Sequence, residues 1–162
     1  MIKNNASDKG KHIDDLRGAF EHRAAWFYLL IEEAQKRGLD MDFARDAIYG
    51  CGCFHGKTKF TQYGDDLEKF CEAFAHQNVR DIFEMDVKCN SEEMNVTFHY
   101  CPLVNSWQNF TKDEEKIAKL CDIAMDGDRG IANEVPFEFK LGKTIAKGDD
   151  VCEVTFRKRK NA

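Results

Sequence analysis

The chain has 162 residues, of which 43% are hydrophobic and 33% charged, and its formal net charge is −5. This length fits one domain, and this composition is typical of a water-soluble globular protein. The negative charge argues against nucleic acid as a partner, and no apolar run approaches the roughly 20 residues needed to span a bilayer.

The two ends of the chain differ from the rest. Residues 1–11 are polar and lack periodicity, so we expect a flexible N-terminal tail. Residues 159–162 form a basic C-terminal tail, which leaves residues 12–158 as a single domain. The seven cysteines cannot all pair within one chain, and the polar N-terminus does not resemble a signal peptide. We therefore predict reduced thiols and a cytoplasmic location.

Three helices are predicted in the N-terminal half. Apolar residues recur at helical spacing over residues 12–37, and Gly38 provides a stop. Asp40 can cap a second helix that ends near Gly50, and the Asp65-Asp66 pair can cap a third.

Between the second and third helices lies Cys51-Gly52-Cys53-Phe54-His55, which suggests metal ligands. The two cysteines are only one residue apart and lack a second ligand pair, unlike a zinc knuckle. We therefore predict no metal, and interpret the stretch as a glycine-rich turn. A mobile loop over a site is the intermediate alternative.

Alternating apolar residues predict four strands. Residues 79–89 form the first, Asn90 begins a turn, and residues 94–101 return antiparallel inside the sheet. Two more strands follow at residues 137–141 and 152–156, connected through residues 142–150. The expected fold is α+β: a four-stranded antiparallel sheet of two hairpins, with the N-terminal helices and a helical crossover packed on it.

Reactive side chains gather at the end of the second strand. If the alternating apolar side chains between positions 94 and 100 face the core, His99 and Cys101 project together from the opposite face. Pro102 ends the strand, and Thr111 is the expected N-cap of the helix that follows. An imidazole beside a thiol suggests nucleophilic or acid–base chemistry.

Three aspartates and an arginine follow within that helical region. Asp122, Asp126 and Asp128 could orient the histidine, hold a cationic substrate group or bind a metal, and Arg129 could pair with a substrate carboxylate. The alternative for Asp126-Gly127-Asp128 is an ordinary tight turn or helix end, since it is too short for a calcium loop.

Several motifs together resemble the bacterial 2-amino-thiazoline-4-carboxylate hydrolase family. The similar segments are residues 23–27, 98–104 with Trp107, 120–125, 127–130 and 144–152. The closing Gly148-Asp149-Asp150-x-Cys152 is also similar, more loosely, to 4-vinyl reductase type small-molecule-binding domains.

This resemblance implies a hydrolase that opens a cyclic amidine to give N-carbamoyl-cysteine. The catalytic residues are expected to be His99, as general base or activator of Cys101, and Asp122 or Asp128, holding the amidinium. The expected substrate-binding residues are Arg23, Trp26, Tyr100, Trp107, Cys121, Asp126, Arg129 and Cys152. No metal or cofactor is implied, the partner is a small-molecule substrate, and a homodimer stays open.

A non-catalytic small-molecule-binding or sensory domain is the alternative function. A catalytic site should place His99, Cys101 and an aspartate around a polar cavity that water can reach. A binding module should instead have a mostly apolar cavity.

Overall fold

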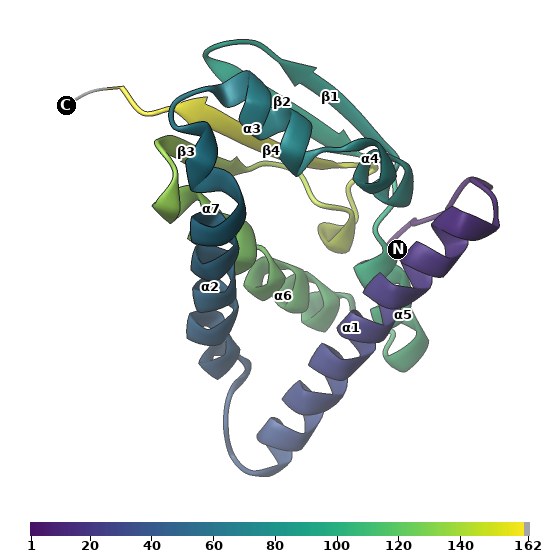
Figure 1. Ribbon diagram of the computed structural model, residues 1–162. Helices are drawn as coiled ribbons and strands as arrows, with labels where there is room; N and C mark the ends of the chain where they lie inside the picture. Colours follow the sequence, from purple (N-terminus) through teal and green to yellow (C-terminus); the bar gives the residue numbers. More distant parts are fainter. Residues whose placement is uncertain (161–162) are drawn as a thin grey trace.

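One antiparallel sheet of four strands forms the upper layer of the protein in the computed structural model, which describes residues 1–160 (Figure 1). The strands lie in the order β1-β2-β4-β3, so β2 is interior, as predicted. Their bounds are β1 (Met85–Cys89), β2 (Glu93–Phe98), β3 (Phe137–Leu141) and β4 (Cys152–Lys158). The α+β prediction is confirmed.

The register of the sheet explains its apolar face. Val96 of β2 lies opposite Val87 on one side and Val154 on the other. Met94 and Val96 are fully buried, whereas Asn95 between them is exposed, as the alternation predicts. Phe70 of helix α3 (Leu67–Phe74) packs on this face, with its ring centroid 5.1 Å from that of Phe156.

Seven α-helices are present in residues 1–160, and α1 and α2 diverge below the sheet with α6 between them (Figure 1). Short helical turns join some of the elements. The bounds are α1 (Lys11–Lys36), α2 (Ala44–His55), α3 (Leu67–Phe74), α4 (Gln77–Phe83), α5 (Pro102–Phe110), α6 (Glu114–Ala124) and α7 (Asp126–Glu134). None of these helices is both long and apolar enough to cross a membrane.

The predicted helix starts are confirmed in part. Asp40 caps a turn (Met41–Phe43) that leads into α2, and Asp66 caps α3 by accepting a hydrogen bond from the Lys69 N–H. The N-cap of α6 is Asp113 instead of Thr111, which ends α5.

Two elements differ from the prediction. Residues 77–83 form helix α4, and Glu84 in the left-handed region (φ 52°) ends it before β1 begins, so the predicted strand was too long. Strand pairing already ends at Phe98, so Pro102 does not stop the strand; instead it begins α5, because proline suits the first position of a helix.

The segment from Cys51 to His55 is helical, and its interpretation as a glycine-rich turn is wrong. Gly52 lies against α7, where a Cβ at this position would meet the Gly127 carbonyl oxygen at 2.0 Å. Gly130 of α7 lies as close to α2, since a Cβ at this position would lie 2.2 Å from the backbone carbonyl oxygen of Tyr49. The glycines therefore allow two helix backbones to touch instead of turning the chain.

Both ends of the described chain contact the body of the protein. Ile2 is buried, and the Asn4 side chain exchanges two hydrogen bonds with the backbone of Cys101, at 2.8 and 2.9 Å. In the expected basic tail, the Arg159 guanidinium donates to the Ala132 carbonyl. Residues 161–162 of that tail lie outside the described residues.

The contact between α2 and α7 gives a direct test. Gly52→Ala should lower the free energy of unfolding by more than about 3 kcal/mol or prevent folding, because backbone cannot yield as a side chain does. Gly50→Ala, in the same helix with nothing within 4 Å of its Cβ, should raise stability by about 0.5–1 kcal/mol. Urea denaturation of both variants measures the difference, and equal effects would contradict this account.

Candidate functional site

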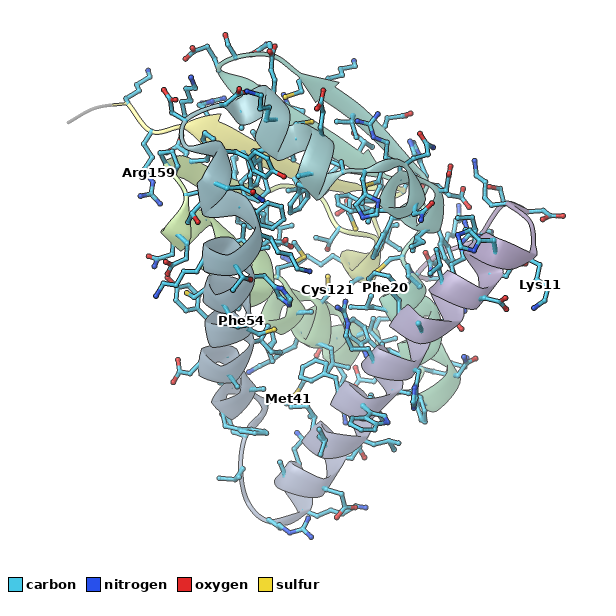
Figure 2. The ribbon with its side chains drawn as sticks, in the orientation of Figure 1. Lys11, Phe20, Met41, Phe54, Cys121 and Arg159 are labelled. Atoms are coloured by element: carbon cyan, nitrogen blue, oxygen red, sulfur yellow. The ribbon has the colours of Figure 1, made fainter. Side chains whose placement is uncertain are left out.

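A cavity of about 620 Å³ lies between the sheet and the helices. Figure 2 labels two of its lining residues, Phe20 and Cys121, near the middle of the molecule. Much of the wall comes from two hydrophobic clusters that share Met125, one containing Trp107 and Cys121 and the other containing Phe60. The size is that of a small-molecule site.

Three thiols line one part of this cavity: Cys101 before α5, Cys121 in α6 and Cys152 at the start of β4. Burial raises the pKa of all three, that of Cys152 to about 12. The backbone N–H groups of Val104 and Leu103 oppose this effect at Cys101 but do not overcome it. The thiols are therefore neutral near pH 7, and the Cys152 sulfur accepts a hydrogen bond from the Ile145 N–H at 3.2 Å.

Asp128 of α7 supplies a carboxyl group to the wall of the cavity. Burial raises its pKa to about 7, although Arg23 and Arg129 act in the opposite direction. Both protonation states are thus populated at neutral pH, which suits a group that transfers protons.

Arg23 of α1 brings a positive charge to the cavity, and its guanidinium carbon lies 4.9 Å from the Phe20 ring centroid. Its charge acts on Asp128 and also, after burial and Lys59, lowers the pKa of His55. A guanidinium in a partly apolar wall is a natural partner for a ligand carboxylate.

Two polar atoms of the wall are buried and lack a hydrogen-bond partner among residues 1–160. They are Nδ1 of His55, at the end of α2, and Oγ1 of Thr144, before β4. Buried polar groups are usually paired, so these two atoms are exceptions among the lining residues.

His99 does not line this cavity. Its Nε2 lies 2.8 Å from Oδ2 of Asp86 on β1, and 46% of its side-chain surface is exposed. The expectation that His99 and Cys101 share a face is wrong, because the strand ends at Phe98. Of residues 98–101, Phe98 and Cys101 line the cavity, whereas His99 and Tyr100 do not. Tyr100 is buried, and its hydroxyl donates to Glu21 at 3.3 Å.

Asp122, Asp126 and Arg129 belong to a separate cluster that also contains Arg45. Each arginine bridges both aspartates: Arg45 reaches Asp122 at 2.7 Å and Asp126 at 2.8 Å, and Arg129 reaches them at 2.8 and 2.5 Å. Burial alone would raise the pKa of Asp122, but hydrogen bonds from Arg45 and Arg129 together lower it. These charges pair with one another and join α2, α6 and α7, so they leave Asp128 as the aspartate of the cavity.

The two tryptophans also separate. Trp107 lines the cavity and its indole N–H donates to the Ala24 carbonyl at 3.0 Å, whereas Trp26 is 64% exposed and outside the lining.

All seven cysteines are free thiols. In residues 1–160, no three or more side chains of His, Cys, Asp or Glu are grouped as metal ligands, so the absence of metal stays a prediction.

Several lining residues were missed from the sequence. The rings of Phe20, Phe83 and Phe98 meet edge to face, with centroids 5.2 and 5.7 Å apart, and form a continuous aromatic wall. In the sequence they follow the same patterns as core residues, so nothing marks them as facing a cavity. Arg45 was also missed, because its aspartate partners lie 77 and 81 residues away.

Comparison with known proteins gives one family match. The family model for L-2-amino-thiazoline-4-carboxylic acid hydrolase matches residues 17–156. No curated protein matches the sequence. The chain is similar to a crystal structure of a trafficking protein particle complex subunit 3 from Naegleria fowleri, covalently bound to palmitic acid. That similarity covers 91% of this chain and 82% of the other at 19% identity and a TM-score of 0.39, too low to support an inference about function.

The raised pKa of Asp128 predicts a pH-dependent stability. Between about pH 4 and 7 the folded protein binds more protons at this group than the unfolded chain, so its contribution to stability falls as pH rises. Asp128→Asn removes this loss. Its free energy of unfolding, relative to that of the parent, should therefore rise by roughly 2–4 kcal/mol between pH 4 and pH 8. Urea denaturation across this range measures the gain.

Asp66 is a matched control with the opposite sign, since its hydrogen bonds with Lys69 lower the pKa of its carboxyl. The parent protein should gain stability relative to Asp66→Asn as pH rises through the acid range. Parallel stability curves for the parent and Asp128→Asn would show that Asp128 titrates normally.

Proposed function

The chain belongs to the L-2-amino-thiazoline-4-carboxylic acid hydrolase family, and from that premise we propose that its cavity opens 2-amino-thiazoline-4-carboxylate, or a close cyclic amidine, by hydrolysis. The product would be N-carbamoyl-cysteine. The observation that carries this proposal is Asp128, a carboxyl with a pKa of about 7 in a cavity that also holds Arg23.

The reaction consumes one water. It breaks the bond between the ring sulfur and the ring carbon that is bonded to both sulfur and nitrogen. The water oxygen becomes the carbonyl of the product, one proton goes to the ring nitrogen and the other to the departing sulfur. A carboxylate can take a proton from the attacking water and return it to the sulfur, and a pKa near the working pH suits both steps. We assign this role to Asp128.

Arg23 supplies the second requirement, a cation for the substrate carboxylate. A guanidinium can hold a carboxylate through two parallel hydrogen bonds, which fixes orientation as well as charge. Once the substrate is held this way, its ring would lie beside Asp128 and the three thiols.

We assign the general base to Asp128 in place of His99, because His99 pairs with Asp86 outside the cavity. Cys101 could act as a nucleophile only as a thiolate, and burial raises the pKa of its thiol. In this proposal water is therefore the nucleophile, and Cys101, Cys121 and Cys152 form part of the wall.

The mostly apolar lining favours a second candidate, a domain that binds a small molecule without chemistry. Such a protein would hold the thiazoline acid and release it unchanged. Either function has a small-molecule partner. A cytoplasmic location, the absence of nucleic acid and membrane partners, and a homodimer stay predictions from the sequence.

Incubation of the purified protein with excess thiazoline acid, followed by an assay of released thiol, separates the two candidates. Asp128→Asn should lower kcat by about a hundredfold or more, the usual scale for a general acid–base group. His99→Ala is the matched control and should stay within about threefold of the parent. Loss of turnover in His99→Ala, with Asp128→Asn active, would overturn the assignment.

Cys101→Ala distinguishes the nucleophile. If water attacks directly, this variant should retain activity within about tenfold of the parent, whereas loss of a covalent nucleophile would abolish turnover. Complete inactivity of a folded Cys101→Ala variant would move the thiol to the centre of the mechanism.

The pH profile provides an independent readout. Because the carboxylate form of Asp128 would accept the proton of water, kcat/KM should rise about tenfold per pH unit below pH 7 and level off above it. The residual kcat/KM of Asp128→Asn should not show this rise with pH. A parent profile that is flat between pH 5 and 7 would contradict the role.

A further inference from the structure

We infer that the ligand of this cavity carries an apolar chain beyond its ring and carboxylate, and that the chain lies in the part of the cavity lined by phenylalanines. The identity of the ring rests on the proposed function, whereas the chain is inferred from the cavity itself.

The cavity has two chemically different parts. One part is lined by the three thiols, Trp107 and Leu103, which belong to the first hydrophobic cluster. The charge of Arg23 acts on both Cys101 and Asp128, so the groups assigned to the reaction lie around this guanidinium. The other part is lined from the second cluster by the apolar residues Phe60, Ala73, Phe74, Met85, Phe98 and Leu141. The two parts meet at Met125, which packs against both clusters.

The second part offers apolar surface that the protein does not cover. Phe74, Phe83 and Phe98 line the cavity and are only partly buried. Their edge-to-face contacts hold the rings in place: Phe83 packs on Phe98, and Phe74 packs on Phe156 with a centroid distance of 5.1 Å. Covering such surface with an apolar chain is favourable, and the rings need no rearrangement first.

The size of the cavity leads to the same conclusion. The thiazoline acid has about nine non-hydrogen atoms, whereas cavities of roughly 300–1,000 Å³ hold drug-sized ligands. The volume here is about 620 Å³. With the ring and carboxylate placed at Asp128 and Arg23, the phenylalanine-lined part would remain empty unless the ligand extends into it.

The test measures binding separately from catalysis. The probes are 2-amino-thiazole-4-carboxylates, whose aromatic ring resists hydrolysis, with straight alkyl groups from methyl to octyl on ring carbon 5. Calorimetry with the parent protein should show affinity rising about threefold to fourfold per CH₂ until the space is full. An affinity independent of chain length would overturn the inference.

A pair of variants locates the chain. Ala73→Leu narrows the phenylalanine-lined part, so it should leave the methyl compound within about twofold of the parent and weaken the octyl compound by about tenfold. Ala47→Leu is the matched control, since Ala47 is exposed on α2 and outside the lining. Equal affinities of both variants for the octyl compound would show that the chain binds elsewhere.

Straight-chain alkyl carboxylates, which lack the ring, separate this inference from the proposed function. If they show the same dependence on chain length while no thiazoline acid is hydrolysed, the apolar part stands and the proposed reaction fails. If thiazoline acid is hydrolysed but neither series depends on chain length, the reaction stands and the inference fails.

Discussion

The direct contact between α2 and α7 is the constraint on which the site depends. The axes of packed helices normally lie 8–10 Å apart because side chains lie between the two backbones. Here Gly52 lies against Gly127, and Gly130 lies against Tyr49, where any Cβ would meet backbone atoms. This approach brings the end of α2, with His55, and the first turn of α7, with Asp128, to the same cavity wall.

The ring of two arginines and two aspartates holds the same junction from outside. Arg45 extends from α2, Asp122 from α6, and Asp126 and Arg129 from α7. Because each charge has two partners, the ring satisfies its members without involving a ligand. Two aspartates that are only two residues apart thus differ completely: Asp126 is paired with arginines, whereas Asp128 faces the cavity with a raised pKa.

The environment of the cavity decides which of its groups can react. Burial keeps the three thiols neutral, so their number does not make them nucleophiles. The same burial raises the pKa of Asp128 to about 7, where a carboxyl group can both accept and donate a proton. One physical effect, burial, therefore keeps the thiols protonated and raises the pKa of the carboxyl group, while much of the remaining wall is apolar.

Local patterns in the sequence determined the elements that rest on periodicity and capping. The long first helix, the alternation through Met94 and Val96, the cap at Asp66 and the two hairpins could all be predicted, because each depends on residues close together in the chain. The family resemblance came from ordered motifs, and the family match confirmed it. Cys101, Asp128 and Arg23 were expected in the site, and all three line the cavity.

Only the tertiary structure decided how neighbouring residues divide between cavity, surface and ion pairs. His99 and Cys101 separate because β2 ends at Phe98, before both of them, and strand alternation cannot predict where pairing stops. Gly52 and Gly127 resemble turn residues until the partner helix is known. Besides Arg129, Asp122 and Asp126 pair with Arg45, about 80 residues away, and no local pattern predicts a contact across that distance. Sequence supplies the chemical groups and their local conformation, but long-range packing sets the burial and the partners from which their reactivity follows.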